Sequence, residues 1–169
     1  DNPGYLGIMR PSGSGDVVSG VVGAVVRNVN AFRNGEKNDN TAGGPVGIWT
    51  YDADSVTISN CTSFENLSLH NDGGGYDFDG GTTNSIIVDS VSYNNWGPGY
   101  EACSYTYGVI NNNGTNSNNT IVNCTSSGDG YGRAFASVGV FPYQVDIQQL
   151  TVSNLVVNIT NYPCDFYGD

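Results

Sequence analysis

A nine-residue segment recurs along the chain at a nearly constant interval, and this repeat restricts the possible folds more than any other feature. Each copy begins with an aliphatic residue that is followed two positions later by Asn or Asp. The five copies, called boxes below, begin at Val26, Ile58, Ile87, Ile121 and Val152. Their first residues lie 32, 29, 34 and 31 positions apart. Such a period, with uneven insertions, is typical of a solenoid whose coils share one core and differ in their loops.

Short runs that open with glycine form a second repeated feature. They alternate with the boxes along the chain and resemble short strands. These leading runs begin at Gly7, Gly47, Gly75, Gly99 and Gly132. Five boxes and five leading runs together predict about five coils.

The residue types of the repeat indicate strands. The boxes and the segments before them are rich in Val, Ile, Thr, Ser and Tyr, and clusters of Gly, Asn and Asp border them, which is typical of short strands. No stretch of twelve residues carries the 3.6-residue apolar period of an amphipathic helix. The sequence therefore predicts an all-β parallel solenoid and argues against leucine-rich or helical repeats.

The third position of each box is always Asn or Asp. We expect this residue to occupy a bend, because Asn adopts the left-handed backbone conformation more readily than most residues other than Gly. Coils stack about 4.8 Å apart, so these side chains should hydrogen-bond to one another as a ladder. The ladder would contain Asn28, Asn60, Asp89, Asn123 and Asn154.

Three features together resemble the right-handed parallel β-helix repeat proteins of the pectin-lyase-like superfamily, above all its secreted, glycan-associated members. They are the Asn-bend box, the Gly-rich segment DGGGYDFDGGTTNSI at residues 72–86, and the YNN at residues 93–95. The resemblance covers about residues 44–160, and residues 4–34 fit as a more divergent coil. It implies a right-handed parallel β-helix. The length of 169 residues fits a single domain over residues 1–169. It selects no function, because this fold hosts lyases, hydrolases, epimerases, tailspikes and adhesins.

Charge restricts the partners. The chain has 5 basic and 16 acidic residues and a formal charge of −11, which argues against nucleic acid and anionic membranes. An anionic polysaccharide would need a bridging cation such as Ca²⁺, and a solvated surface is the simpler explanation of the acidic residues.

No hydrophobic run approaches the ~18 residues of a membrane span. Since the sequence starts at Asp1 without an initiator Met or signal peptide, we expect a mature product or a section of a longer protein.

Alignment of the leading runs on their glycines places carboxylates and aromatic rings on one outward face. Asp77 and Asp79 lie in one run, Glu101 in the next, and Trp49 and Tyr51 in the run before. In strands, the two aspartates would lie about 7 Å apart, and Glu101 about 4.8 Å away on the next coil.

Three interpretations of these carboxylates remain open. Asp77, Asp79 and Glu101 could supply the acid and base of polysaccharide cleavage, or Asp77 and Asp79 could bind Ca²⁺. In either case Trp49 and Tyr51 would be platforms for sugar rings. The structural alternative is that the aspartates accept hydrogen bonds at the following Gly-Gly turn.

Other features argue against an enzyme. Arg10 and Arg133 are the only bases expected near this face, and five coils are few for a long substrate groove. His70, the only histidine, has no Ser or Cys partner nearby in the sequence, so a nucleophilic triad is not expected.

The sequence contains six N-glycosylation sequons. We expect glycans on those in loops, Asn66, Asn113 and Asn118, and on Asn158 near a coil end. The remaining two sequons belong to the bend ladder and should stay unmodified.

The four cysteines are compatible with an oxidising compartment. Cys61 and Cys124 occupy the same box position two coils apart, which corresponds to about 9.6 Å. Because Cα atoms in a disulfide are rarely more than ~7 Å apart, we expect two buried thiols. Cys103 and Cys164 are the remaining candidate bridge.

The ends of the solenoid suggest assembly. Residues 4–9 and 150–160 are uncharged, and neither flank has the helix that usually caps a solenoid. We therefore expect an extracellular or cell-surface building block, structural or glycan-associated, that stacks end to end on further coils. The alternative is a polysaccharide lyase or hydrolase.

Overall fold

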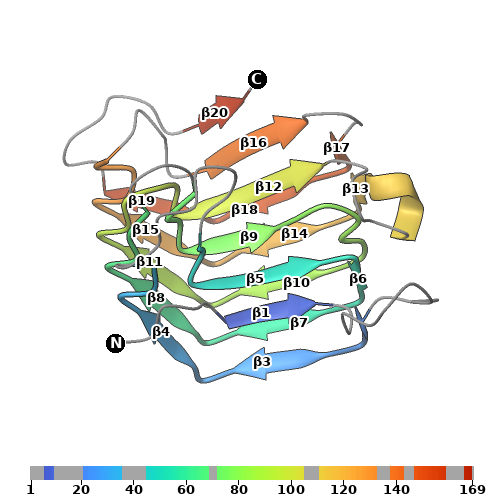
Figure 1. Cartoon of the computed structure of the whole chain (residues 1–169), viewed down its shortest axis with the longest axis horizontal. Coiled ribbons are helices and arrows are strands. Elements are labelled where there is room, and N and C mark those ends of the chain that lie inside the picture. Colours follow the sequence, from blue (N-terminus) through green and yellow to red (C-terminus); the bar gives the residue numbers. More distant parts are fainter. Residues whose placement is uncertain are drawn as a thin grey trace.

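The chain forms a parallel β-solenoid in which successive coils stack along one axis (Figure 1). The computed structural model describes residues 6–9, 21–35, 45–68, 72–104, 111–132, 138–142, 147–158 and 166–168. Among these residues the only helix is the 3₁₀ turn η1 (Asn111–Gly114), and no helix is long and apolar enough to cross a membrane. The predicted all-β class is confirmed.

Three parallel sheets run the length of the described solenoid. The leading sheet pairs its strands in the order β1 (Leu6–Met9), β5 (Ile48–Tyr51), β9 (Tyr76–Phe78), β12 (Tyr100–Ser104), β16 (Val138–Pro142) and β20 (Phe166–Gly168). The first box sheet contains β3 (Val25–Arg27), β7 (Thr57–Ser59), β10 (Ile86–Val88), β14 (Thr120–Val122) and β18 (Thr151–Ser153). The second box sheet contains β4 (Asn30–Phe32), β8 (Thr62–Phe64), β11 (Val91–Tyr93), β15 (Thr125–Ser127) and β19 (Val156–Asn158).

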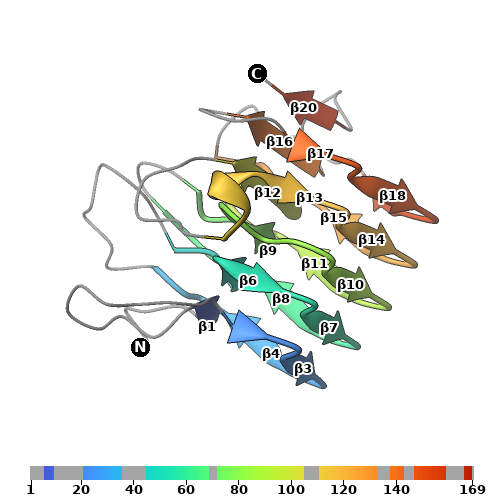
Figure 2. The same ribbon diagram turned by 90° about the vertical axis from the view of Figure 1, so that its right-hand side faces the viewer.

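Two short strand pairs connect the leading sheet to the box sheets. They are β2 (Val21–Val22) with β6 (Ala53–Asp54), and β13 (Asn116–Ser117) with β17 (Ile147–Gln148). Single bridges from Asp54 to Thr83 and from Thr83 to Ser117 join the two pairs into one column. Figure 2 shows the coils from this side, as rows that ascend from β3 and β4 to β18.

The register of the box sheets agrees with the predicted repeat. The first residues of the five boxes pair in one unbroken column, from Val26 through Ile58, Ile87 and Ile121 to Val152. Each box sheet therefore stacks five strands, one from each box. The uneven spacing of the boxes is absorbed outside the sheets.

The predicted bend ladder is also present. All five Asn and Asp residues at the third box position have φ between 50° and 57°. Asn60 Nδ2 donates to Asn28 Oδ1 at 2.6 Å, Asn123 Nδ2 to Asp89 Oδ1 at 3.2 Å, and Asn154 Nδ2 to Asn123 Oδ1 at 2.8 Å. The ladder is interrupted before Asp89, because a carboxylate has no N–H to donate to the coil below.

Left-handed bends recur more often than the sequence indicated. In one coil Asn84, Asp89 and Asn94 have φ of 51°, 50° and 53°. Successive bends lie five positions apart, and each five-residue period contains three strand residues, the bend and one residue that points inward. Since these bends include Ser55, Glu65 and Gln149, the residue type alone does not reveal them.

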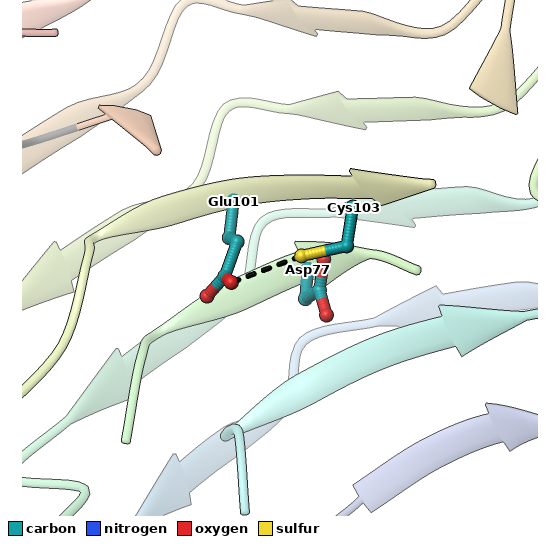
Figure 3. Close-up of side chains that lie close together, drawn as sticks. All are labelled: Asp77, Glu101 and Cys103. Atoms are coloured by element: carbon teal, nitrogen blue, oxygen red, sulfur yellow. Dashed lines mark hydrogen bonds between the residues drawn. The ribbon is translucent and has the colours of Figure 1, made fainter. Parts of the chain in front are cut away.

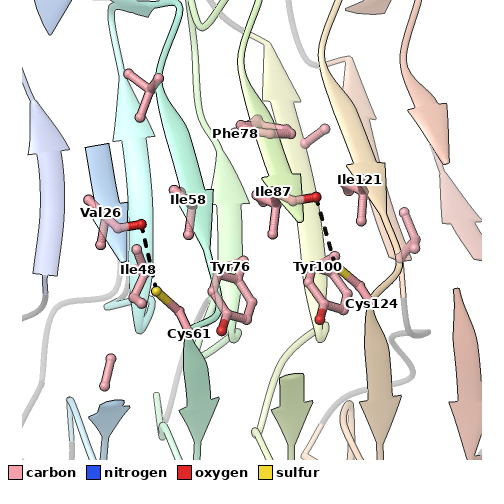
Figure 4. Close-up of a cluster of buried hydrophobic side chains, with 14 of the residues drawn as sticks. Val26, Ile48, Ile58, Cys61, Tyr76, Phe78, Ile87, Tyr100, Ile121 and Cys124 are labelled. Atoms are coloured by element: carbon pink, nitrogen blue, oxygen red, sulfur yellow. Dashed lines mark hydrogen bonds between the residues drawn. The ribbon is translucent and has the colours of Figure 1, made fainter. Parts of the chain in front are cut away.

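Columns of buried side chains fill the interior (Figure 4). Ile58, Ile87 and Ile121 form the aliphatic column and are fully buried. Tyr76 and Tyr100 stack with ring centroids 5.1 Å apart. Their hydroxyls donate to the carbonyls of Val91 and Ser90 at 3.1 and 2.8 Å, so neither buried hydroxyl is left without a partner.

The glycines that open the leading runs allow a close approach between sheets. A Cβ atom at Gly75 would lie 2.3 Å from Ser92 Oγ and 2.6 Å from the carbonyl oxygen of Gly99. No side chain fits at such distances. A glycine is therefore required where β5, β9 and β12 begin against the second box sheet. The predicted alignment on glycines does not extend to the first and last runs, because Gly7 pairs with Trp49, and Val138, six residues after Gly132, pairs with Tyr100.

Candidate functional site: the carboxylates of the leading sheet

Strands β9 and β12 bring the predicted carboxylates together. Asp77 pairs with Trp49 on one side and with Glu101 on the other. Since side chains alternate along a strand, the flanking Tyr76 and Phe78 point into the core, and Asp77 points to the opposite side of the sheet. The predicted alignment of these three residues is confirmed.

This side of the sheet is not the accessible face that the sequence predicts. Asp77, Glu101 and Cys103 are only 5%, 3% and 6% exposed. Strand alternation correctly separated them from the core, but it carries no information on what lies against the other side. A polymeric substrate therefore has no open access to these carboxylates.

Asp77, Glu101 and Cys103 form the centre of the site, called the acid–thiol cluster below (Figure 3). One ligand atom from each of the three side chains lies within 4.8 Å of the other two. Cys103 Sγ donates to Glu101 Oε1 at 3.0 Å. Within the described part of the chain Asp77 Oδ1 is buried and has no hydrogen-bond partner.

Electrostatics favour the neutral forms of two members of the cluster. Burial raises the pKa of Asp77 well above its ordinary value, and the negative charges of Asp79, Glu101 and Asp72 raise it further. Burial also raises the pKa of the Cys103 thiol, and Glu101 adds to the effect. Without a cation, the cluster therefore retains protons that exposed groups would lose.

Asp79 behaves as the structural interpretation predicts. Its Oδ1 accepts a hydrogen bond from the backbone N–H of Gly80 at 2.8 Å, at the turn that precedes Gly81. Binding of Ca²⁺ by Asp77 and Asp79 stays a prediction. The group of three potential ligands among the described residues joins Asp77 to Glu101 and Cys103.

Trp49 and Tyr51 lie on β5, beside the cluster, and both are half-buried. Their ring centroids are 6.1 Å apart, and the planes meet at 63°. The rings therefore pack edge to face, and their predicted role as platforms for sugar rings stays a prediction.

A buried polar ladder, which the sequence did not predict, runs through the solenoid beside the second box sheet. Asn34 Nδ2 donates to Asn66 Oδ1 at 2.9 Å, Asn66 Nδ2 to Asn95 Oδ1 at 2.8 Å, and Asn95 Nδ2 to Asp129 Oδ1 at 2.8 Å. The signal was present in the boxes, because these residues are the ninth of each of the first four.

The buried ladder corrects one predicted glycosylation site. Asn66 is fully buried, and its amide group is bonded to Ser63 and Asn95, so it does not lie in an accessible loop. Asn113, Asn118 and Asn158 are exposed. Asn118 Nδ2 also donates to Asn84 Oδ1 at 2.7 Å, which makes it part of another surface row.

The cysteines also require one correction. Cys61 and Cys124 are buried and free, as predicted. Cys103 is free as well, so the predicted bridge to Cys164 is not formed. Cys164, Arg10, His70 and Arg133 lie outside the described residues.

Comparison with known proteins adds no assignment to this geometry. Neither a scan against protein-family models nor searches of curated proteins and of solved structures find a match to this chain. Function must therefore be argued from the fold and the site.

Proposed function

We propose that the chain is a building block of an extracellular β-solenoid, in which further coils stack on its first and last coils. The observation that carries this proposal is the state of the two edges. In the described residues β3 and β4 pair only with β7 and β8 at one edge, and β18 and β19 pair only with β14 and β15 at the other. Such edges present unpaired backbone groups to any matching strand.

The first coil exposes large apolar side chains. Val22, Val25 and Phe32 are 68%, 63% and 52% exposed. Phe32 is also the last ring of an aromatic stack, with centroids 5.0 Å from Phe64, which in turn lies 4.7 Å from Tyr93. An added coil would cover the outer face of Phe32 and remove apolar surface from water.

The bend ladder gives the two edges complementary polarity. Every described rung runs from an amide N–H to the oxygen of the preceding coil. Asn28 therefore offers N–H groups at one edge, and Asn154 offers Oδ1 at the other. Head-to-tail stacking continues this pattern, and a contact of that kind does not close on itself.

Membership of the pectin-lyase-like superfamily and an extracellular location belong to the same proposal. They rest on the sequence resemblance and on the exposed sequons Asn113, Asn118 and Asn158. Expression in a secreting eukaryotic host followed by intact glycopeptide mass spectrometry should find glycans on these sites and none on Asn66. Occupancy of Asn66 would contradict the fold described here.

A double substitution tests the stacking. Val25 and Thr151 lie in one column, at opposite edges of the first box sheet, so Val25→Lys with Thr151→Lys brings two like charges together only across a contact between copies. We expect concentration-dependent assembly of the wild type in sedimentation velocity, loss of assembly in this variant, and partial recovery at high salt.

The matched control places the same two charges in the interior of the column. Thr57→Lys with Thr120→Lys should assemble like the wild type, because neither residue lies at an edge. A wild-type chain that stays monomeric at all concentrations and unfolds cooperatively would overturn the building-block proposal.

Polysaccharide cleavage by Asp77, Asp79 and Glu101 remains the alternative function. The raised pKa of Asp77 beside Glu101 is the observation in its favour, because a general acid needs such a shift. The burial of both side chains weighs against it. Reducing ends or unsaturated products released from a panel of polysaccharides by the wild type, and not by Asp77→Asn, would support the enzyme.

A further inference from the structure

We propose that Asp77, Glu101 and Cys103 form a binding site for a single thiophilic divalent cation, and that Zn²⁺ is its physiological ligand. This inference concerns the side of the leading sheet opposite the core, on the central strands β9 and β12, and is independent of how the ends of the solenoid assemble. Two carboxylates and one thiolate would supply three ligands, and the fourth position would remain for water or another ligand, as in tetrahedral zinc sites with three protein ligands.

The geometry of the cluster is close to that of a ligand set. In a tetrahedral site, with bonds of about 2.0 Å to oxygen and 2.3 Å to sulfur, neighbouring ligand atoms lie roughly 3.3 to 3.6 Å apart. Cys103 Sγ and Glu101 Oε1 are 3.0 Å apart, and all three ligand atoms lie within 4.8 Å.

The backbone that carries the ligands is fixed by the sheet. Glu101 and Cys103 are two residues apart on β12, so they point to the same side. Asp77 lies on β9 and is the direct register partner of Glu101. Figure 3 shows the three side chains on one side of these two strands. Ligands on paired strands need little reorganisation to bind an ion.

Asp77 supplies the second, independent observation. Its side chain is 5% exposed, and among the described residues its Oδ1 has no hydrogen-bond donor. Buried carboxylate oxygens are normally hydrogen-bonded, paired with a charge or bound to a metal. A cation between Asp77 and Glu101 would satisfy this oxygen.

The thiol decides which class of cation fits. Ca²⁺ and Mg²⁺ take oxygen ligands, whereas thiolate ligands select zinc and similar soft or borderline ions. Asp79, which could extend an all-oxygen site, has its Oδ1 bonded to the Gly80 N–H. On binding, the Cys103 proton that now bonds to Glu101 leaves to solvent, and the thiolate bonds to the metal.

Cadmium is the most direct probe, because a cadmium–thiolate bond has a charge-transfer band in the ultraviolet. The full chain would be reduced, stripped with a chelator and titrated with Cd²⁺. We expect one equivalent to produce the band, Zn²⁺ to displace Cd²⁺, and excess Ca²⁺ to have no effect. Zn²⁺ should also raise the melting temperature of the wild type.

Matched cysteine variants assign the band to one thiol. Cys103→Ser should abolish it. Cys61→Ser with Cys124→Ser should retain it, since both thiols lie in the core column in which Ser90 is already accommodated. Cys164→Ser should also retain it. Circular dichroism would confirm that each variant is folded.

Asp77→Asn is a second test of the metal site that keeps the thiol in place. It can be used even if Cys103→Ser does not fold. We expect it to weaken Cd²⁺ binding at least about tenfold, because it removes one of three anionic ligands. The proposal is overturned if Cd²⁺ produces no one-equivalent band, if the band survives Cys103→Ser, or if Asp77→Asn binds Cd²⁺ as tightly as the wild type.

Discussion

At the scale of single residues, the same amino-acid type serves opposite purposes in this chain. Asn60 and Asn66 belong to one box, and both donate along a ladder. Asn60 is exposed at a bend with φ of 51°. Asn66 is fully buried between coils, where losing a partner costs far more than it does in water. The position within the five-residue period decides the energetic role.

The interruption of the surface ladder at Asp89 leads to the first residue-scale prediction. Asp89→Asn should stabilise the fold by about 0.5 kcal/mol, because an amide can donate to Asn60 and still accept from Asn123. The measurement is the urea midpoint of the variant against that of the wild type.

The reverse substitution at the next coil is the control. Asn123→Asp would place a second carboxylate beside Asp89, which Asn123 now contacts at 3.2 Å, and should destabilise by about 1 kcal/mol. If both variants unfold at the wild-type midpoint, the surface ladder does not contribute to stability.

At the scale of the elements, the stability of the box sheets depends on polar columns as well as on aliphatic ones. Asn95 accepts bonds from the backbone and side chain of Asn66. It also donates to Asp129, Ser92 and the carbonyl of Ser63. These bonds join three successive coils, so β8, β11 and β15 cannot separate without losing several of them.

A comparison of two positions in the buried ladder tests this dependence. Asn95→Ala should destabilise by roughly 3 kcal/mol or more, because it leaves several buried donors and acceptors unsatisfied. Asn34→Ala at the end of the ladder should cost only about 1 to 2 kcal/mol, since Asn34 donates only to Asn66 Oδ1 there. Chemical unfolding of both variants measures the difference, and equal losses would refute a cooperative ladder.

Much of this architecture can be predicted from the sequence, and particular residues show why the rest cannot. The aliphatic first positions and the Asn bends follow a fixed period, so the register of the box sheets follows from spacing alone. Asn66 looks like a loop sequon, because whether the ninth position points inward depends on bends at residues such as Glu65 that have no distinctive composition. Asp77 looks exposed, because the burial of the outer side of a sheet is a property of the assembled fold.

At the scale of the whole molecule, the main electrostatic feature is the excess of acidic over basic residues. The formal charge is −11, and three carboxylates show shifts with different signs. Asp77 and Asp129 have raised pKa values, first because of burial. Asp54 has a lowered pKa, first because of the hydrogen bond from Thr83 and further because of that from Asn84. These groups act on stability in different ranges of pH.

The signs of these shifts predict an unusual pH profile for the metal-free protein. A carboxyl whose folded pKa is raised contributes most below its unfolded pKa of about 3.9, and this contribution is lost as pH rises through the folded value. Asp77 and Asp129 should therefore make the protein less stable at pH 7.5 than at pH 4.5. Asp54 acts oppositely, but it loses its contribution only as pH falls below about 3.9, outside that interval.

Urea unfolding in chelator at the two pH values measures how steeply stability changes with pH. Asp77→Asn should reduce the slope, because the amide cannot titrate. A wild-type protein that is more stable at pH 7.5 than at pH 4.5 without metal would contradict the burial of Asp77 and Asp129 as the main electrostatic cost of this fold.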